Sequence, residues 1–266
     1  MVDNIFDLTA ENYAEIVPAC RFCQFLTLMH ELDLMGNEKI LDVGCGPGVL
    51  TVEIAKRLKA GCITGLDLSE NMIRLAERLA KEHLVENVRF EKGDALNLQF
   101  PKETFDVVIS TSVFHWVKDP KKFLLELHRV LKKGGKLGLT SRGPDSYREF
   151  WHAFEAVAKR YPQYFPENSL TAYMGVRIYS DHELEKELEP VGFKTQKRFV
   201  LTVQGPVTLQ SYLKRINAVT GDIDHQSVPE AKRDLIRKQI EDILKSDGGG
   251  ELKATECASF IIAVKV

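Results

Sequence analysis

Short apolar runs alternate with longer amphipathic stretches over the first half of the chain, and this pattern predicts strands and helices in turn. The predicted strands cover residues 39–43, 62–68, 88–94, 106–110 and 136–141, and the predicted helices cover residues 50–59, 71–81 and 123–131. We count five alternations of strand and helix with short connections. Such a rhythm predicts an α/β fold, a doubly wound parallel sheet with helices on both faces and right-handed crossovers.

The regions on either side of this core follow a different pattern. Apolar residues recur at helical spacing over residues 9–34, and Gly36 stops that run. After Ser141 the alternation breaks, and an aromatic-rich loop with two prolines follows a predicted helix. The later elements are expected at residues 147–160, 181–190, 194–203, 208–219, 229–245 and 258–266. We therefore expect one domain over 1–266, with a helical lead-in or lid (1–36), a cofactor-binding core (37–141) and helical cap insertions (142–179 and 205–255).

Composition narrows the classes of partner. The chain has 266 residues, 44% of them hydrophobic, which suffices for one large core with a cap. The net charge is −2 with both signs spread throughout, so we expect no nucleic-acid partner and favour a small-molecule substrate. No apolar run reaches membrane-spanning length, and the first 19 residues lack the order of a signal peptide. We expect a cytoplasmic protein with no membrane partner, and the sequence does not define an oligomeric state.

The five cysteines form an odd set without disulfide spacing, which predicts reduced thiols. Two residues separate Cys20 from Cys23, a spacing that occurs in zinc and redox sites. They fall in a predicted helix with no second Cys or His pair at ligand spacing, so we interpret them as packing residues. No metal site is predicted.

A glycine-rich turn follows the strand that begins at Lys39. Gly44, Gly46 and Gly48 connect this strand to a helix, where a ligand can approach bare backbone and the free N–H groups of the helix start. A dinucleotide fingerprint needs a further glycine where Val49 stands, which counts against NAD or FAD and against an oxidoreductase. Asp67 ends the next strand about twenty residues later, and its two acceptor oxygens suit a ribose diol.

The ordered set of Asp42, the three glycines and Asp67 resembles the class I S-adenosylmethionine (SAM) methyltransferases. The resemblance implies a Rossmann-like, seven-stranded, mostly parallel sheet whose antiparallel last strand lies between two others. It also implies that SAM is the cofactor and S-adenosylhomocysteine (SAH) the product. Position by position, the glycines would face the methionine part of SAM and Asp67 the ribose, while Asp94 and Ala95 would face the adenine. A protein that binds SAM without turnover is the alternative outside enzymology.

Further residues are expected around the cofactor because of their places in this pattern. Tyr13, in the lead-in helix, either closes over the cofactor or packs, and Met72 is mostly a core residue whose end can touch the base. Thr111 and Trp116 follow the fourth strand, at the edge of the sheet where ligands gather. The complete set expected at the cofactor is Tyr13, Asp42, Gly44, Cys45, Gly46, Gly48, Asp67, Leu68, Met72, Gly93, Asp94, Ala95, Thr111 and Trp116.

The second half of the chain is similar to the malonyl-carrier-protein and trans-aconitate methyltransferase group, which esterifies carboxylates. The segments that carry this likeness begin at Ser141, Asp181 and Leu209. The resemblance implies a small or acyl-carrier-tethered acid as the methyl acceptor. Residues 114–116, Phe-His-Trp, depart from the Leu-Gln-Trp of that group, which leaves the acceptor open.

Two kinds of side chain are candidates for the chemistry. Arg142, Arg148 and Arg177 lie in or beside the expected cap, where a guanidinium could hold a carboxylate through two parallel hydrogen bonds. His115 has an ordinary pKa of roughly 6.5 and could act as base if the acceptor is a hydroxyl or an amine. A packed histidine and solvated arginines are the plain alternatives.

Overall fold

The computed structural model describes residues 19–165, 177–220, 228–247 and 252–266. The chain divides into two compact units. The first comprises residues 1–143, 179–201 and 258–266, and the second comprises 144–178 and 202–257. The bounds of the second unit are close to those of the expected insertions, while the assignment of that unit as a cap over the substrate stays a prediction. Tyr13 and the first half of the expected lead-in, residues 1–18, lie outside the described residues.

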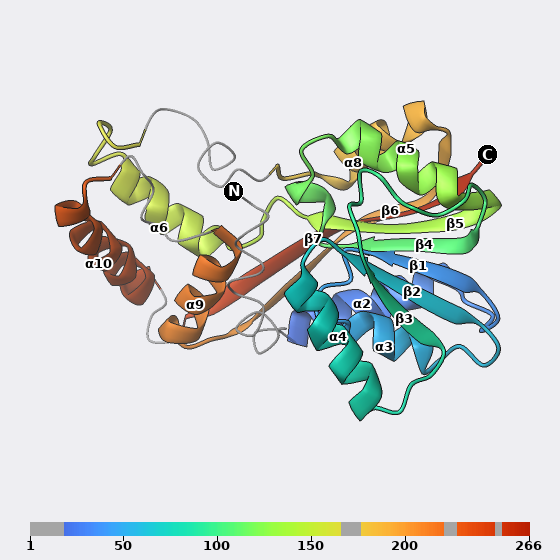
Figure 1. Ribbon diagram of the computed structural model, residues 1–266. Helices are drawn as coiled ribbons and strands as arrows, with labels where there is room; N and C mark the ends of the chain where they lie inside the picture. Colours follow the sequence, from blue (N-terminus) through green and yellow to red (C-terminus); the bar gives the residue numbers. More distant parts are fainter. Residues whose placement is uncertain (1–18, 166–176, 221–227, 248–251) are drawn as a thin grey trace. The chain divides into compact units, whose positions relative to one another are not determined.

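The first unit is organised around a seven-stranded sheet in the order β3-β2-β1-β4-β5-β7-β6 (Figure 1). Strands β1 to β5 pair in parallel, whereas β7 runs antiparallel to β5 and lies between β5 and β6. This confirms the predicted Rossmann-like fold with its antiparallel last strand. The bounds are β1 Lys39–Val43, β2 Cys62–Asp67, β3 Val88–Lys92, β4 Phe105–Thr111, β5 Leu131–Arg142, β6 Phe193–Pro206 and β7 Lys253–Lys265.

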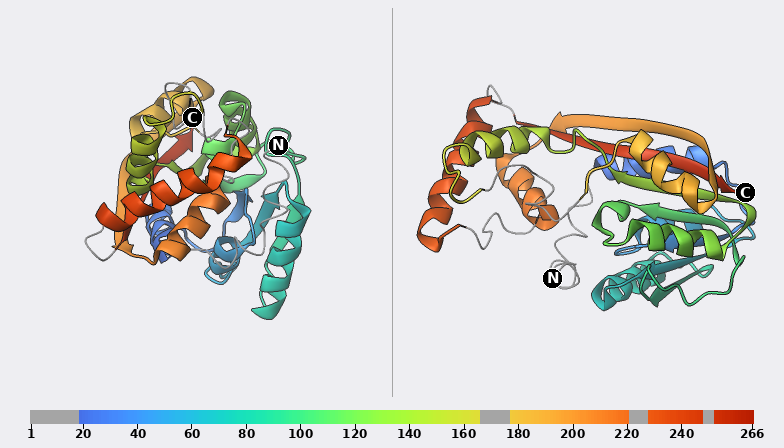
Figure 2. Two further views of the ribbon diagram at one scale, coloured as in Figure 1. Left: turned by 90° about the vertical axis from the view of Figure 1, so that its left-hand side faces the viewer. Right: turned by 90° about the horizontal axis from the view of Figure 1, so that it is seen from above.

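Helices cover both faces of this sheet, as two separate apolar clusters show (Figures 1 and 2). Ile40 faces the cluster made with α2 (Ala19–Leu32) and α3 (Val49–Ala55), whereas its neighbour Leu41 faces the cluster made with α5 (Pro120–Val130) and α8 (Asp181–Leu188). The alternation follows from the strand geometry, which points successive side chains to opposite faces. A further helix, α4, spans Glu70–Glu82, and the Ser69 side chain caps it by accepting from the N–H of Met72.

The predicted count of five strand–helix alternations is wrong, because no helix connects β3 to β4. Residues 93–104, all of them described, contain no helix. The α5 side chains satisfy this segment instead: the Arg129 guanidinium donates to the carbonyls of Leu98 and Phe100 at 2.7 and 2.6 Å, and Glu126 accepts from the Leu98 N–H at 2.8 Å. Because its backbone groups find these partners, the segment needs no helical hydrogen bonds.

Three element boundaries differ from the prediction by four residues or more. Helix α3 ends at Ala55, four residues before the predicted end, and β7 begins at Lys253, five residues before the predicted start. Strand β5 begins at Leu131, five residues before its predicted start at 136, and includes Gly134 and Gly135. The pairing of β4 with β5 shifts register between Phe105 and Val107, which accommodates the extra residues.

The second unit is helical, with α6 (Arg148–Ala158), α9 (Leu209–Thr220) and α10 (Glu230–Asp247). α6 packs against α10, and its aromatic residues are buried. Tyr212 of α9 donates its hydroxyl hydrogen to Glu149 at 3.2 Å and accepts from the N–H of Phe150 at the same distance. Among the described helices of both units, none has the length and apolar character needed to cross a bilayer.

Candidate active site

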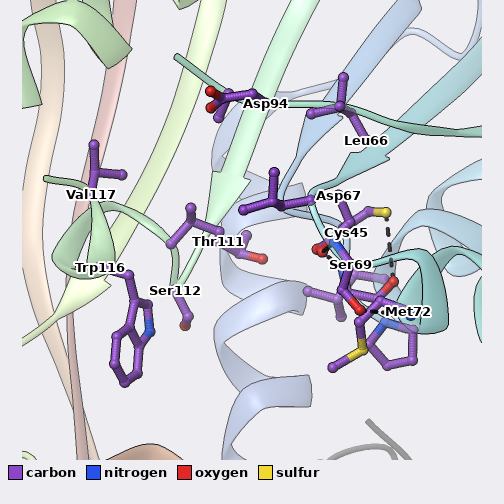
Figure 3. A pocket seen from close by; sticks show the side chains of 18 of the residues that line it. Cys45, Leu66, Asp67, Ser69, Met72, Asp94, Thr111, Ser112, Trp116 and Val117 are labelled. Carbon is purple, nitrogen blue, oxygen red and sulfur yellow. Dashed lines mark hydrogen bonds between the residues drawn. The ribbon is translucent and has the colours of Figure 1, made fainter. Parts of the chain in front are cut away.

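A cavity of about 590 Å³ opens in the first unit, beside the carboxyl ends of β1, β2 and β4 (Figure 3). Its volume lies in the usual range for small-molecule sites. The expected cofactor residues that line it are Gly44, Cys45, Gly46, Asp67, Leu68, Met72, Gly93, Asp94, Ala95, Thr111 and Trp116. Sequence reasoning missed Pro47, Val49, Leu50, Leu66, Ser69, Leu96, Ser112, Val113, Val117 and Lys118. Their nearness in sequence to the motif residues is the signal that could have found them.

The three glycines of the turn all have positive φ, from 55° to 78°, but they serve different purposes. A side chain at Gly44 would overlap Val113, and one at Gly48 would come within 2.6 Å of the Cβ of Ala76. A Cβ at Gly46 would meet nothing within 4 Å, although Gly46 lines the cavity. The glycines at 44 and 48 are therefore required for packing, and Gly46 is the position where a side chain would take ligand space. Gly48 does not line the cavity, contrary to our expectation.

Asp67 holds the glycine turn through backbone hydrogen bonds. One carboxylate oxygen accepts from the N–H of Gly46 and the other from the N–H of Ser69, both at 2.9 Å. Asp94 is more exposed and accepts from the N–H of Leu96 at 2.8 Å. Because each carboxylate oxygen has more than one lone pair, both acids can also accept hydrogen bonds from a ligand in the cavity. Asp67 therefore shapes the site as well as offering an acceptor to it.

Asp42 was expected among the cofactor contacts, but it does not line the cavity. Its carboxyl is almost fully buried; Oδ2 accepts from the Thr51 hydroxyl at 2.7 Å, and Oδ1 has no hydrogen-bond partner among the described residues. Burial raises the pKa of Asp42 to about 7, against the opposing effect of the Thr51 hydrogen bond, and the charge of Asp67 raises it further. The hydrogen bond to Thr51 joins β1 to α3 across the glycine turn, and the raised pKa favours the protonated form of the Asp42 carboxyl.

We expect the stability of the folded chain to fall as pH rises from about 4 to about 7 through Asp42. The folded state keeps a proton there that the unfolded state, with an ordinary pKa of 3.8, has already released. Asp42→Asn can still accept from Thr51 but carries no charge, so it should be more stable than the natural chain at pH 8, by a few kcal/mol at most. Thermal unfolding at pH 5 and pH 8 measures this difference, and an equal pH dependence of the two proteins would refute it.

The end of β4 contributes a strained residue to the cavity. Ser112 has a φ of 58°, in the left-handed region that serines rarely adopt. Its backbone N–H is held by both the carbonyl and the hydroxyl oxygen of Thr140, at 3.2 and 3.1 Å, and the next residue, Val113, fills the space beside Gly44. These contacts fix the conformation. Thr111, Ser112 and Trp116 line one side of the cavity in Figure 3.

His115 and Arg142, two of the expected catalytic residues, are buried and do not line the cavity. Nδ1 of His115 accepts the backbone N–H of Arg142 at 3.2 Å, and the Arg142 guanidinium lies 5.9 Å from the centre of the Trp116 ring. The two residues thus contact each other and the Trp116 ring, and their roles as base and substrate clamp stay predictions. Arg148, paired with Glu149 at 3.6 Å, and the exposed Arg177 belong to the second unit, so their roles stay predictions.

The sheet order, the glycine turn at the end of β1 and the acids that follow β2 and β3 define a Rossmann-like cofactor-binding protein of the methyltransferase type. Residues 34–192 match the family described as a methyltransferase domain. The chain belongs to this family. The cavity fits SAM, because Gly46 leaves open space beside two carboxylates.

Two curated relatives illustrate the range of acceptors. The chain is 32% identical over 159 residues to a malonyl-[acyl-carrier protein] O-methyltransferase of Paenibacillus sp. (strain JDR-2), which covers 59% of this chain and 55% of that protein. It is also 32% identical over 141 residues to a demethylmenaquinone methyltransferase of Geobacillus sp. (strain WCH70), covering 51% and 60%. The chain thus spans little more than half the length of these relatives.

The fold extends further than the sequence similarity. A solved methyltransferase structure from Bacillus halodurans C-125 aligns over 91% of this chain and 98% of its own, with a TM-score of 0.65 and 21% identity. This likeness concerns the fold alone.

Proposed function

We propose that the chain transfers a methyl group from SAM to a carboxylate oxygen of a small or carrier-tethered acid. One observation favours this acceptor over a hydroxyl or an amine: no histidine lines the cavity among the described residues, and His115 is buried with Nδ1 engaged. A carboxylate has no proton to lose at neutral pH, so it needs no base. The malonyl acceptor in the name of the Paenibacillus relative supports the same class.

The residues of the chain bind, orient and enclose the reactants in this proposal. Asp67 would accept from the ribose hydroxyls, Asp94 from the adenine amino group, and Gly46 would let the cofactor approach the backbone. Bound SAM supplies an electrophilic methyl group. Trp116 and Met72 give the cavity apolar walls that exclude water, while the fixed glycine turn and β4 end keep donor and acceptor in line.

The test begins with binding and ends with turnover. Calorimetry should show that SAM and SAH bind in the micromolar range and that NAD does not, because Val49 replaces the third glycine of a dinucleotide site. Labelled SAM should then methylate a carboxylic acid from a panel of acids, phenols, alcohols and amines. With an acid as acceptor, kcat/KM should be flat between pH 6 and 9, since no histidine base titrates.

Two results would contradict the proposal. NAD binding without SAM binding would remove the cofactor assignment, and turnover only of amines or phenols with a pH limb near 6.5 would remove the carboxylate. Binding of SAM with no turnover on the whole panel would favour a regulatory protein.

A further inference from the structure

The cavity lining carries charges of both signs, and the negative charges outnumber the positive. Asp67 and Asp94 contribute two carboxylates to its lining. Lys118, which follows the turn that contains Trp116, contributes the one cationic side chain among the described lining residues. A ligand carboxylate that enters the cavity is repelled by the two acids and attracted by this lysine. Within the cavity, a ligand carboxylate is therefore most favourable near the ammonium of Lys118.

Lys118 has no ion-pair or hydrogen-bond partner among the described residues, although it stands beside an acid in the sequence. The adjacent Asp119 is engaged elsewhere, because its carboxylate caps α5 by accepting the N–H of Lys122 at 2.9 Å. Some other lysines of the first unit are paired, such as Lys132 with Asp106 at 2.6 Å. The ammonium of Lys118 is thus available to a ligand, and its exposed position lets it reach one without a burial cost.

The arginines of the first unit do not offer the same contact to the cavity. Arg142 is 6% exposed, and its guanidinium lies over the ring of Trp116, a residue that does line the cavity. Arg129 is engaged with Glu126 and with the carbonyls of the β3–β4 connection. Neither of them lines the cavity. The lysine that sequence reasoning missed is therefore the better candidate for binding an acid.

We propose that Lys118 binds a carboxylate of a ligand in the cavity. Two ligands can supply that group: the acceptor acid, which rests on the proposed function, and the methionine end of the cofactor. In either case the ammonium offsets the repulsion from Asp67 and Asp94 and sets the position of the ligand through a charge-assisted hydrogen bond. Lys118 is a specificity residue in this proposal, because a neutral analogue of the ligand would gain nothing from it.

Lys118→Met removes the charge and keeps much of the side-chain length. Lys121→Met is the matched control, because Lys121 lies in the first turn of α5, is exposed and does not line the cavity. Calorimetry would compare SAH with 5′-methylthioadenosine, which lacks the amino acid part. Binding of malonyl-pantetheine and of its neutral methyl ester would be measured in the presence of SAH. Lys118→Arg tests whether a second cation restores the effect.

We expect the Lys118→Met variant to lose about tenfold in affinity for one carboxylate ligand, the size of a partly exposed charged hydrogen bond. Loss for malonyl-pantetheine with no loss for its ester or for SAH assigns Lys118 to the acceptor. Loss for SAH with no loss for methylthioadenosine assigns it to the cofactor. Equal behaviour of Lys118→Met and Lys121→Met on all four ligands overturns the proposal. Failure of the natural chain to bind malonyl-pantetheine would count against the acceptor alone, because the SAH comparison still decides the role of Lys118.

Discussion

Replacing Gly46 by leucine should abolish SAH binding while leaving the chain folded. The side chain would enter the cavity at a place where a Cβ meets no protein atom within 4 Å. The positive φ of 55° adds strain of roughly 1–2 kcal/mol, which most domains tolerate. The N–H of residue 46 can still donate to Asp67, so the turn keeps its anchor. We expect SAH affinity to fall more than a hundredfold in calorimetry, with a circular dichroism spectrum like that of the natural chain.

The chain offers a matched control for the strain. Gly134 in β5 also has a positive φ, 74°, and open space around its Cβ, but it does not line the cavity. Gly134→Leu should therefore show the same loss of stability as Gly46→Leu with unchanged SAH affinity. Gly44→Ala should fail differently, because its methyl group would overlap Val113 and disrupt the fold. Normal SAH binding by Gly46→Leu would show that this turn does not face the cofactor.

Replacing Asp67 by alanine should weaken SAH binding by about 2–4 kcal/mol, or roughly 30- to 1000-fold, because an ionised acceptor is lost from the ligand site. The structure adds a second expectation. The N–H groups of Gly46 and Ser69 would lose their acceptor, so the unliganded protein should also become less stable by about 1–3 kcal/mol. Calorimetry with SAH and denaturant unfolding without it measure the two effects separately.

Two further variants separate the contribution of the ligand contact from that of the turn. Asp67→Asn keeps one acceptor oxygen, so it should retain more stability than Asp67→Ala while still losing the charge. Asp94→Ala removes an exposed acid that accepts a backbone hydrogen bond from the N–H of Leu96, and it should weaken SAH binding by less than Asp67→Ala does. A folded Asp67→Ala protein with unchanged SAH affinity would dismiss the proposed ribose contact.

The sheet could be predicted from the sequence because its signal is repeated in every element. Short apolar runs, amphipathic helices and a glycine turn after the first strand agree with one another, and the structure confirms the sheet that they predict. The β3–β4 connection could not be predicted in this way. Its backbone is satisfied by Arg129 and Glu126 of a later helix, which is a tertiary contact without a local pattern.

The site was predictable as a location and less so as a set of roles. The motif placed the cavity at the glycine turn, and eleven of the expected residues line it. It did not show that Gly44 and Gly48 serve packing, since Val113 and Ala76 approach them from distant segments. The sequence analysis named arginines near the expected cap as candidates to bind an acid. It did not name Lys118, because a single lysine in a loop has no distinguishing pattern.

The left-handed backbone of Ser112 has a consequence for protein engineering. A non-glycine residue in that conformation costs roughly 1 kcal/mol, which glycine would recover. A library selected for heat resistance alone would therefore favour glycine at this position and discard a hydroxyl that borders the cavity. Thermostabilised versions of the chain are best made with residue 112 held constant, so that stability is not gained by altering the wall of the cavity.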